Sequence, residues 1–142
     1  MSDAEQTLIE GLNVDLAHEY AAIMSYRSFA SMVRGPYRQE LRGFFESEIT
    51  DELGHAQLLA DKIVSLGGTP TTDVASVELT TDAKEMLEYA LADEVATIER
   101  YVERRRQAEE LDLYGLAVDL DDLIADETKH RDEIRLMLDQ WS

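Results

Sequence analysis

A set of acidic and aromatic residues occurs twice in this chain of 142 residues, and the second copy lies 75 positions after the first. The first copy contains Glu19, Tyr26, Asp51, Glu52 and His55, and the second contains Glu94, Tyr101, Asp126, Glu127 and His130. Apolar residues repeat with the same displacement at Leu12/Leu87, Leu16/Leu91, Ile23/Ile98, Leu41/Leu116 and Ile49/Ile124. The pattern predicts a duplicated pair of helices, in which each copy supplies half of one polar site.

Each copy contains the string Asp-Glu-x-x-His. Residues three apart lie on one face of a helix, so the Glu and the His of each string can bind one ion. A Glu from each of two helices, with Glu-x-x-His from each of the other two, is the pattern of di-iron and di-manganese bundles. We therefore expect two iron ions, with manganese as the alternative, in a site without thiolate ligands. The predicted ligands are Glu19, Glu52, His55, Glu94, Glu127 and His130.

Composition excludes several other kinds of protein. The chain has no cysteine, which excludes disulfides and thiol chemistry, and its net charge of −18 opposes nucleic-acid binding. Its apolar runs are too short to span a membrane, and the acidic segment 1–5 lacks the apolar core of a signal peptide. We expect a single domain over residues 1–142, located in the cytoplasm, with neither a nucleic-acid nor a membrane partner.

Turn residues divide the chain into four long helical segments. The expected helices cover about residues 2–34, 36–66, 82–110 and 114–141. Ser2 and Glu5 have the spacing of a capping box, and glycines follow the first and second helices. Residues 69–80 form a loop long enough to run along a whole bundle. The fold class is therefore predicted as an all-α four-helix bundle with a long crossover between helices 2 and 3.

Longer strings surround the predicted ligands. They are His18-Glu19-Tyr20-Ala21-Ala22-Ile23 with Tyr26, Asp51-Glu52-Leu53-Gly54-His55, Leu91-Ala92-Asp93-Glu94, and Asp126-Glu127-Thr128-Lys129-His130. With these strings the chain resembles bacterioferritin-type members of the ferritin superfamily over nearly its whole length. The resemblance implies that Glu52 and Glu127 bridge two irons and that the other four ligands are terminal. It also implies a ferroxidase, in which O2 or peroxide oxidises Fe(II) and the Fe(III) is stored as mineral inside a protein shell.

Three departures from the bacterioferritin pattern refine these expectations. Leu53 stands where a methionine would bind haem between two subunits, so a haem bound in this way is not expected. The chain ends twelve residues after His130, without room for the fifth helix of large cages. This resembles the mini-ferritins, so we expect a homo-oligomer of about twelve subunits. Glu133 stands where an aromatic residue often follows the last histidine.

Two aspartates are predicted to support the histidine ligands. A ligating histidine normally gives its second ring nitrogen to a carboxylate or a carbonyl, which fixes its tautomer. As the family resemblance implies, Asp51 is assigned to His130 and Asp126 to His55. The alternative is that both aspartates simply lie on solvated helix faces.

Two tyrosines lie two helical turns beyond the first Glu of each copy, on the same helix face. If the first and third helices are antiparallel, Tyr26 approaches Glu94 and Tyr101 approaches Glu19. Each hydroxyl could bond a ligand carboxylate or supply an electron to a reactive intermediate. The alternative is an ordinary core tyrosine.

One acidic group and one basic group of residues are expected to have structural roles. The acidic group consists of Glu46, Glu48, Asp119, Asp121 and Asp122, which could guide iron but are expected on solvated faces. The basic group consists of Arg100, Arg104, Arg105 and Arg106 and is surrounded by glutamates. We expect intrahelical or intersubunit ion pairs here rather than contacts with DNA.

Two other function classes remain open. The first is a non-storing di-iron or di-manganese oxidoreductase, similar to a peroxidase or a catalase. The rubrerythrin version is disfavoured, because the chain lacks cysteine and has Thr97 three residues after Glu94. The second is a scaffold that buffers metal without catalysis, against which stands the cost of burying six ionisable groups without metal. Particle size would distinguish storage in a hollow shell from redox chemistry in a small dimer.

Overall fold

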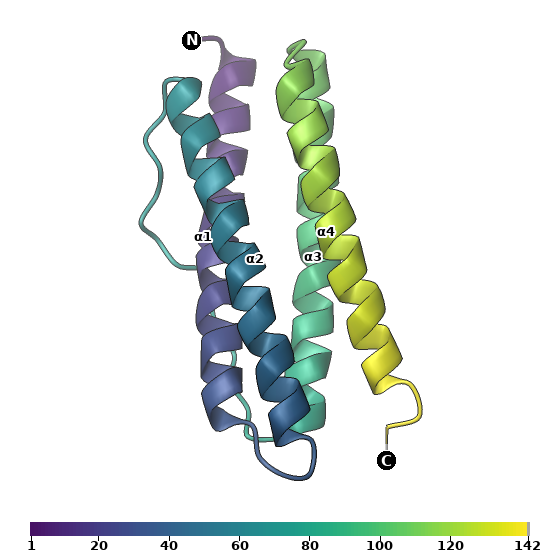
Figure 1. Cartoon of the computed structure of the whole chain (residues 1–142). Helices are drawn as coiled ribbons and strands as arrows, with labels where there is room; N and C mark the ends of the chain where they lie inside the picture. The colour runs from purple at the N-terminus through teal and green to yellow at the C-terminus, as the bar shows by residue number, and fades with distance from the viewer. Residues whose placement is uncertain (142) are drawn as a thin grey trace.

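The computed structural model describes residues 1–141. Its helices are α1 (Asp3–Met32), α2 (Arg38–Ser65), α3 (Ala83–Glu110) and α4 (Tyr114–Leu138). In Figure 1, α1 and α4 run downward while α2 and α3 run upward, so each short connection joins two antiparallel helices. The long connection runs from the top of α2 to the bottom of α3. The fold is therefore the predicted all-α bundle with a crossover between its second and third helices.

The crossover segment is attached to the side of α1 by hydrogen bonds. The side-chain amide of Asn13 donates to the carbonyl of Thr69 and accepts from the backbone N–H of Thr71. One turn further along α1, the N–H of Ala75 donates to the carbonyl of Ala17. These bonds hold the extended segment against the bundle and give its backbone groups the partners that regular structure would otherwise provide.

Local sequence signals account for most helix ends, but three predicted ends were wrong by two or more residues. The first helix ends at Met32, two residues earlier than predicted. The capping box at the start of α1 is present, with reciprocal bonds between Ser2 and Glu5. The second helix begins at Arg38, later than predicted, because Pro36 lies within the turn. The fourth helix ends at Leu138, earlier than predicted, because Gln140 has a φ of 58°, which is incompatible with a helix.

The buried apolar side chains form two clusters, one toward each end of the bundle. One cluster includes Leu12 from α1, Leu59 from α2 and Leu120 from α4. The other includes Phe29 and Phe45, whose ring centroids are 5.6 Å apart. A layer of buried polar residues separates the two clusters along each helix. Among residues 1–141, no helix has an apolar stretch long enough to cross a membrane.

A buried ion pair joins α1 to α3, and it corrects the expectation for two arginines of the basic group, because Nε of Arg100 also lies 3.8 Å from Asp15. Arg104 donates to both carboxylate oxygens of Asp15, at 2.7 and 3.2 Å, instead of pairing with a glutamate of its own helix. The guanidinium occupies the space that a Cβ atom at Gly11 would take. The intrahelical expectation is confirmed for Arg106, which pairs with Glu110 at 2.5 Å.

Candidate metal centre

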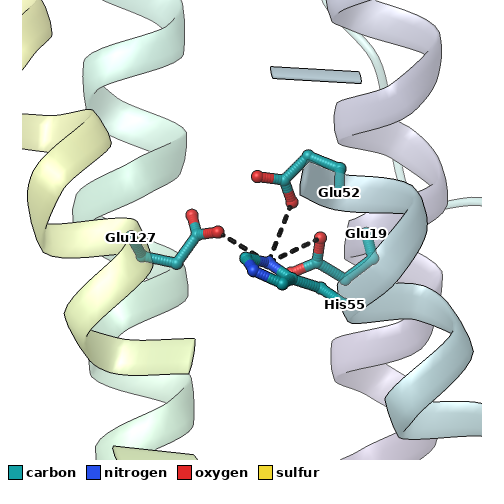
Figure 2. Close-up of side chains that lie close together, drawn as sticks. All are labelled: Glu19, Glu52, His55 and Glu127. Carbon is teal, nitrogen blue, oxygen red and sulfur yellow. Dashed lines mark ion pairs between the residues drawn. The ribbon is translucent and has the colours of Figure 1, made fainter. Parts of the chain in front are cut away.

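The structure brings the six predicted ligand side chains together in the middle of the bundle. Each side chain belongs to a residue at most 7% exposed. Figure 2 shows Glu19 from α1, Glu52 and His55 from α2 and Glu127 from α4 pointing toward one another. On the other side, the ring of His130 lies 6.5 Å from the ring of His55, centroid to centroid. Helical spacing thus aligns the residues within each helix, and the bundle topology brings the four helices to one point.

The first group of candidate ligands surrounds His55. The Nδ1 atom of His55 lies 2.9 Å from Oε1 of Glu127, 3.7 Å from Oε2 of Glu52 and 4.0 Å from Oε2 of Glu19. One ligand atom from each of these four residues lies within 4.8 Å of the other three. A single cation placed between them could therefore contact three carboxylates and one imidazole.

The second group surrounds His130 and contains a residue that was not predicted as a ligand. The Nδ1 atom of His130 lies 2.7 Å from Oε2 of Glu48, 3.6 Å from Oε1 of Glu52 and 3.7 Å from Oε1 of Glu94. It also lies 3.8 Å from Oε1 of Glu127. Glu52 and Glu127 thus contact both imidazoles, which is the placement that two bridging carboxylates require.

The expectation that Glu48 is solvated was wrong, because the residue is only 4% exposed. One signal could have found it, since Glu48 lies four residues before Glu52 and therefore on the same face of α2. The repeat concealed it, because the equivalent position in the second copy is Leu123. Glu48 is therefore a candidate ligand that only the first copy of the repeat contains.

Both predicted aspartate–histidine contacts are present. The Nε2 atom of His130 lies 2.9 Å from Asp51, and Nε2 of His55 lies 3.2 Å from Asp126. Each aspartate stands on the helix opposite its histidine and is about half exposed, with side-chain exposures of 52% and 51%. This arrangement directs Nε2 outward to the aspartate and Nδ1 inward to the carboxylates, so Nδ1 is the nitrogen available to a metal.

The predicted tyrosine contacts are also present. The hydroxyl of Tyr26 donates to Oε1 of Glu94 at 2.5 Å, and the hydroxyl of Tyr101 donates to Glu19. Burial, together with the nearby carboxylates, raises the pKa of both phenols well above the ordinary value. Both hydroxyls therefore stay protonated at neutral pH and act as donors. Their role in electron transfer remains a prediction.

Electrostatics in the cluster favour shared protons when no metal is bound. Burial raises the pKa of Glu19 and Glu127, and neighbouring glutamates raise it further. Burial also opposes ionisation of Glu52, but the nearby Glu19 and both imidazoles outweigh it and lower the pKa of Glu52. The imidazoles of His55 and His130 respond to these carboxylates with raised pKa values, although burial alone would lower them. The cluster thus combines a charged acid with neighbours that keep protons.

The donor atoms of this cluster fit a pair of metal ions. Within residues 1–141, seven buried side-chain atoms of the cluster have no hydrogen-bond partner. These are one oxygen each of Glu19, Glu48, Glu52, Glu94 and Glu127, and Nδ1 of His55 and His130. A buried polar atom without a partner costs about 1–3 kcal/mol, so such a concentration requires compensation. Cations that bind oxygen and imidazole donors, such as iron and manganese, would provide it.

Comparisons with known proteins agree with this geometry. The model of the family "Ferritin-like domain" matches residues 9–142. A solved structure described as "ferritin like, diiron-carboxylate proteins from Bacillus anthracis str. Ames" is 54% identical, with a TM-score of 0.96. A Dps protein from Bacillus brevis is 26% identical, with a TM-score of 0.91. In both cases, 97% of this chain and 99% of the other chain are covered.

Proposed function

Because this chain belongs to the family of ferritin-like domains, as its motifs predicted, we propose that it is a ferroxidase that stores iron. Fe(II) would be the substrate and O2 or H2O2 the oxidant, and the Fe(III) would be kept in a shell of about twelve copies of the chain. The observation that carries the proposal is the layer of seven buried donor atoms without hydrogen-bond partners within residues 1–141. Their number and chemistry match two cations better than they match a structural role.

The side chains have distinct tasks in this reaction. Glu52 and Glu127 would bridge the two ions, because each of them contacts both imidazoles. Glu19 with His55 would hold one ion, and Glu94 with His130 the other. Two Fe(II) ions release two electrons, which reduce O2 and two protons to H2O2, or H2O2 and two protons to two waters. Burial of the layer between two apolar clusters excludes bulk water from the reacting ions.

Proton movement accompanies iron binding. Ligands must be deprotonated to bind a metal, so binding displaces the protons that the raised pKa values of Glu19 and Glu127 retain. The half-exposed Asp51 and Asp126 lie at the edge of the layer, where each contacts a buried imidazole. They would orient the histidines and connect the cluster to solvent.

Assembly into a shell draws support from apolar side chains on the outer surface of the bundle. A hollow on the face formed by α1 and α2 is lined by residues that include Tyr20, Met24, Leu53 and Val74, of which the last three are exposed. An exposed apolar patch of this kind suits a contact between subunits, and homo-oligomers favour closed symmetries. The similarity to the Dps protein gives independent support for an oligomer.

The site is tested by replacing one bridging carboxylate. Glu127→Ala should abolish rapid Fe(II) oxidation. The rate is measured from the absorbance of Fe(III) after air is admitted to an anaerobic sample. Glu133→Ala is the matched control, because Glu133 is exposed on the same helix and should retain the wild-type rate. Oxidation by Glu127→Ala at the wild-type rate would exclude this site as the ferroxidase centre.

Storage is tested by particle size. Sedimentation of protein loaded with Fe(II) in air should show a particle of about twelve subunits that retains many Fe(III) ions per chain. A dimer that oxidises iron without retaining it would support the non-storing oxidoreductase instead. A particle that binds two metal ions per chain without oxidising Fe(II) would support the metal-buffering scaffold.

A further inference from the structure

The candidate centre has an approximate twofold symmetry, which is broken next to one histidine. Tyr26 contacts Glu94 while Tyr101 contacts Glu19, and the aspartate–histidine contacts are reciprocal in the same way. The sequence repeat that relates these pairs makes Leu123 the counterpart of Glu48. Both residues are buried, at 4% and 3% exposure. One half of the centre therefore has a carboxylate where the other half has a hydrocarbon.

Glu48 faces the centre rather than a structural partner. Its Oε2 atom lies 2.7 Å from Nδ1 of His130, but the two atoms are not oriented for a hydrogen bond, and Oε2 has no other partner in residues 1–141. Ligand atoms of Glu48, Glu52, Glu94 and His130 lie within 4.8 Å of one another. The counterpart Leu123 belongs to the apolar cluster that also contains Leu120. Glu48 is thus a buried donor aimed at one metal position only.

A charge count shows what this difference does. The four glutamates that obey the repeat neutralise two divalent cations, and the shared bridges Glu52 and Glu127 serve both positions equally. Glu48 adds one further carboxylate at the position of His130, where it can attract a cation directly. An extra unit negative charge next to a cation attracts it even at an effective dielectric constant of about 20. Part of this is lost to desolvation, because burial raises the pKa of Glu48.

We propose that Glu48 is a metal ligand of the His130 position and that this position binds a divalent cation first and more tightly than the His55 position. The inference rests on the proposed two-metal site and deepens it, since it makes the two ions inequivalent. The first ion would occupy the side with Glu48, and the second would complete the pair next to Glu19.

The test measures Co(II) binding to the intact protein without oxygen, so that no oxidation takes part. The variant His55→Ala keeps only the metal position beside His130 intact. The variant His130→Ala keeps only the metal position beside His55 intact. Adding Glu48→Gln should weaken Co(II) binding about tenfold or more in the His55→Ala background and less than twofold in the His130→Ala background. Glu46→Gln is the matched control, because Glu46 is exposed on the same helix and pairs with Arg42. It should change neither affinity.

The outcomes separate this inference from the function on which it rests. If the wild-type protein does not bind Co(II), the two-metal site itself is overturned. Equal weakening by Glu48→Gln in both backgrounds, or weakening in neither, would overturn only the inequivalence. If a single-histidine variant fails to bind or to fold, wild-type crystals given one Co(II) per chain decide the question. Anomalous density mainly beside His130 supports the proposal, and density mainly beside His55 or equally at both positions overturns it.

Discussion

Removing metal from this protein should make its stability fall as the pH rises from 6 to 8. Five groups of the centre, Glu19, Glu48, Glu127, His55 and His130, have folded pKa values above their ordinary values of 4.5 and 6.5. A raised pKa gives stability that is complete below the unfolded value and is lost as the pH rises through the folded value. Over this range the folded chain thus binds more protons than the unfolded chain. Glu52 has a lowered pKa, so it is ionised in both states above pH 6 and adds nothing to the slope.

The expected magnitude follows from the number of retained protons. Each extra proton on the folded chain lowers the free energy of unfolding by about 1.4 kcal/mol per pH unit. The two histidine groups of the centre each pack an imidazole against three or more carboxylates, so we assign one retained proton to each group. Two protons give a slope of about 3 kcal/mol per pH unit. For a chain of this length, this corresponds to a fall in Tm of about 10 °C per pH unit.

The assay is thermal unfolding of metal-free protein at pH 6, 7 and 8, at constant ionic strength and subunit concentration. His18→Gln serves as a companion variant. Burial lowers the pKa of His18, so this residue makes stability rise with pH, and its removal should make the fall in Tm steeper. Saturation with Mn(II) should raise Tm more at pH 8 than at pH 6, since bound ligands must be deprotonated. A metal-free Tm that stays constant or rises between pH 6 and 8 would refute the reasoning.

Four further outcomes are expected. Arg104→Leu should lower the free energy of unfolding by about 3–5 kcal/mol, because it deprives the buried carboxylate of Asp15 of its main partner; a loss below about 1 kcal/mol in thermal unfolding would contradict this. Tyr101→Phe should cost metal-free protein about 1–3 kcal/mol in the same assay, because it removes the donor to buried Glu19, and an unchanged Tm would argue against that bond. The protein should neither retard plasmid DNA in a gel at low salt, given its net charge of −18, nor show a Soret band, given Leu53 at the haem position.

Much of the candidate centre could be predicted from sequence because its determinants are local or repeated. The pairing of Glu52 with His55 needs only helical spacing, and the repeat supplies the second half of the centre. The contact between Tyr26 and Glu94 followed from one further assumption, that α1 and α3 are antiparallel. Each prediction depended on helix geometry and connectivity, which the turn residues and the long crossover specify.

The environments of Arg104 and Glu48 were predicted wrongly from the sequence, because the burial of each residue depends on a partner far away in the chain. Arg104 is buried because Asp15, 89 positions earlier, meets it across the bundle. Glu48 is buried because the fold places it against His130, which lies on another helix. Arg104 has no local feature that separates it from its solvated neighbours, and Glu48 has only its spacing of four residues from Glu52, in a chain with 31 acidic residues. The packing of the four helices shows that both side chains are buried.

The two halves of the bundle have the same residues at six ligand positions of the centre. They have different residues at some core positions, where the side chain only has to pack. In the sequence repeat, Phe29 corresponds to Arg104, so an aromatic contact with Phe45 on one side becomes an ion pair with Asp15 on the other. Both solutions fill the bundle core, and neither supplies a donor atom to the candidate centre. Glu48 differs from them because it breaks the repeat with a carboxylate directed at His130. An asymmetry in packing leaves two metal positions equivalent, whereas an asymmetry in ligand atoms gives them different affinities and therefore an order of filling.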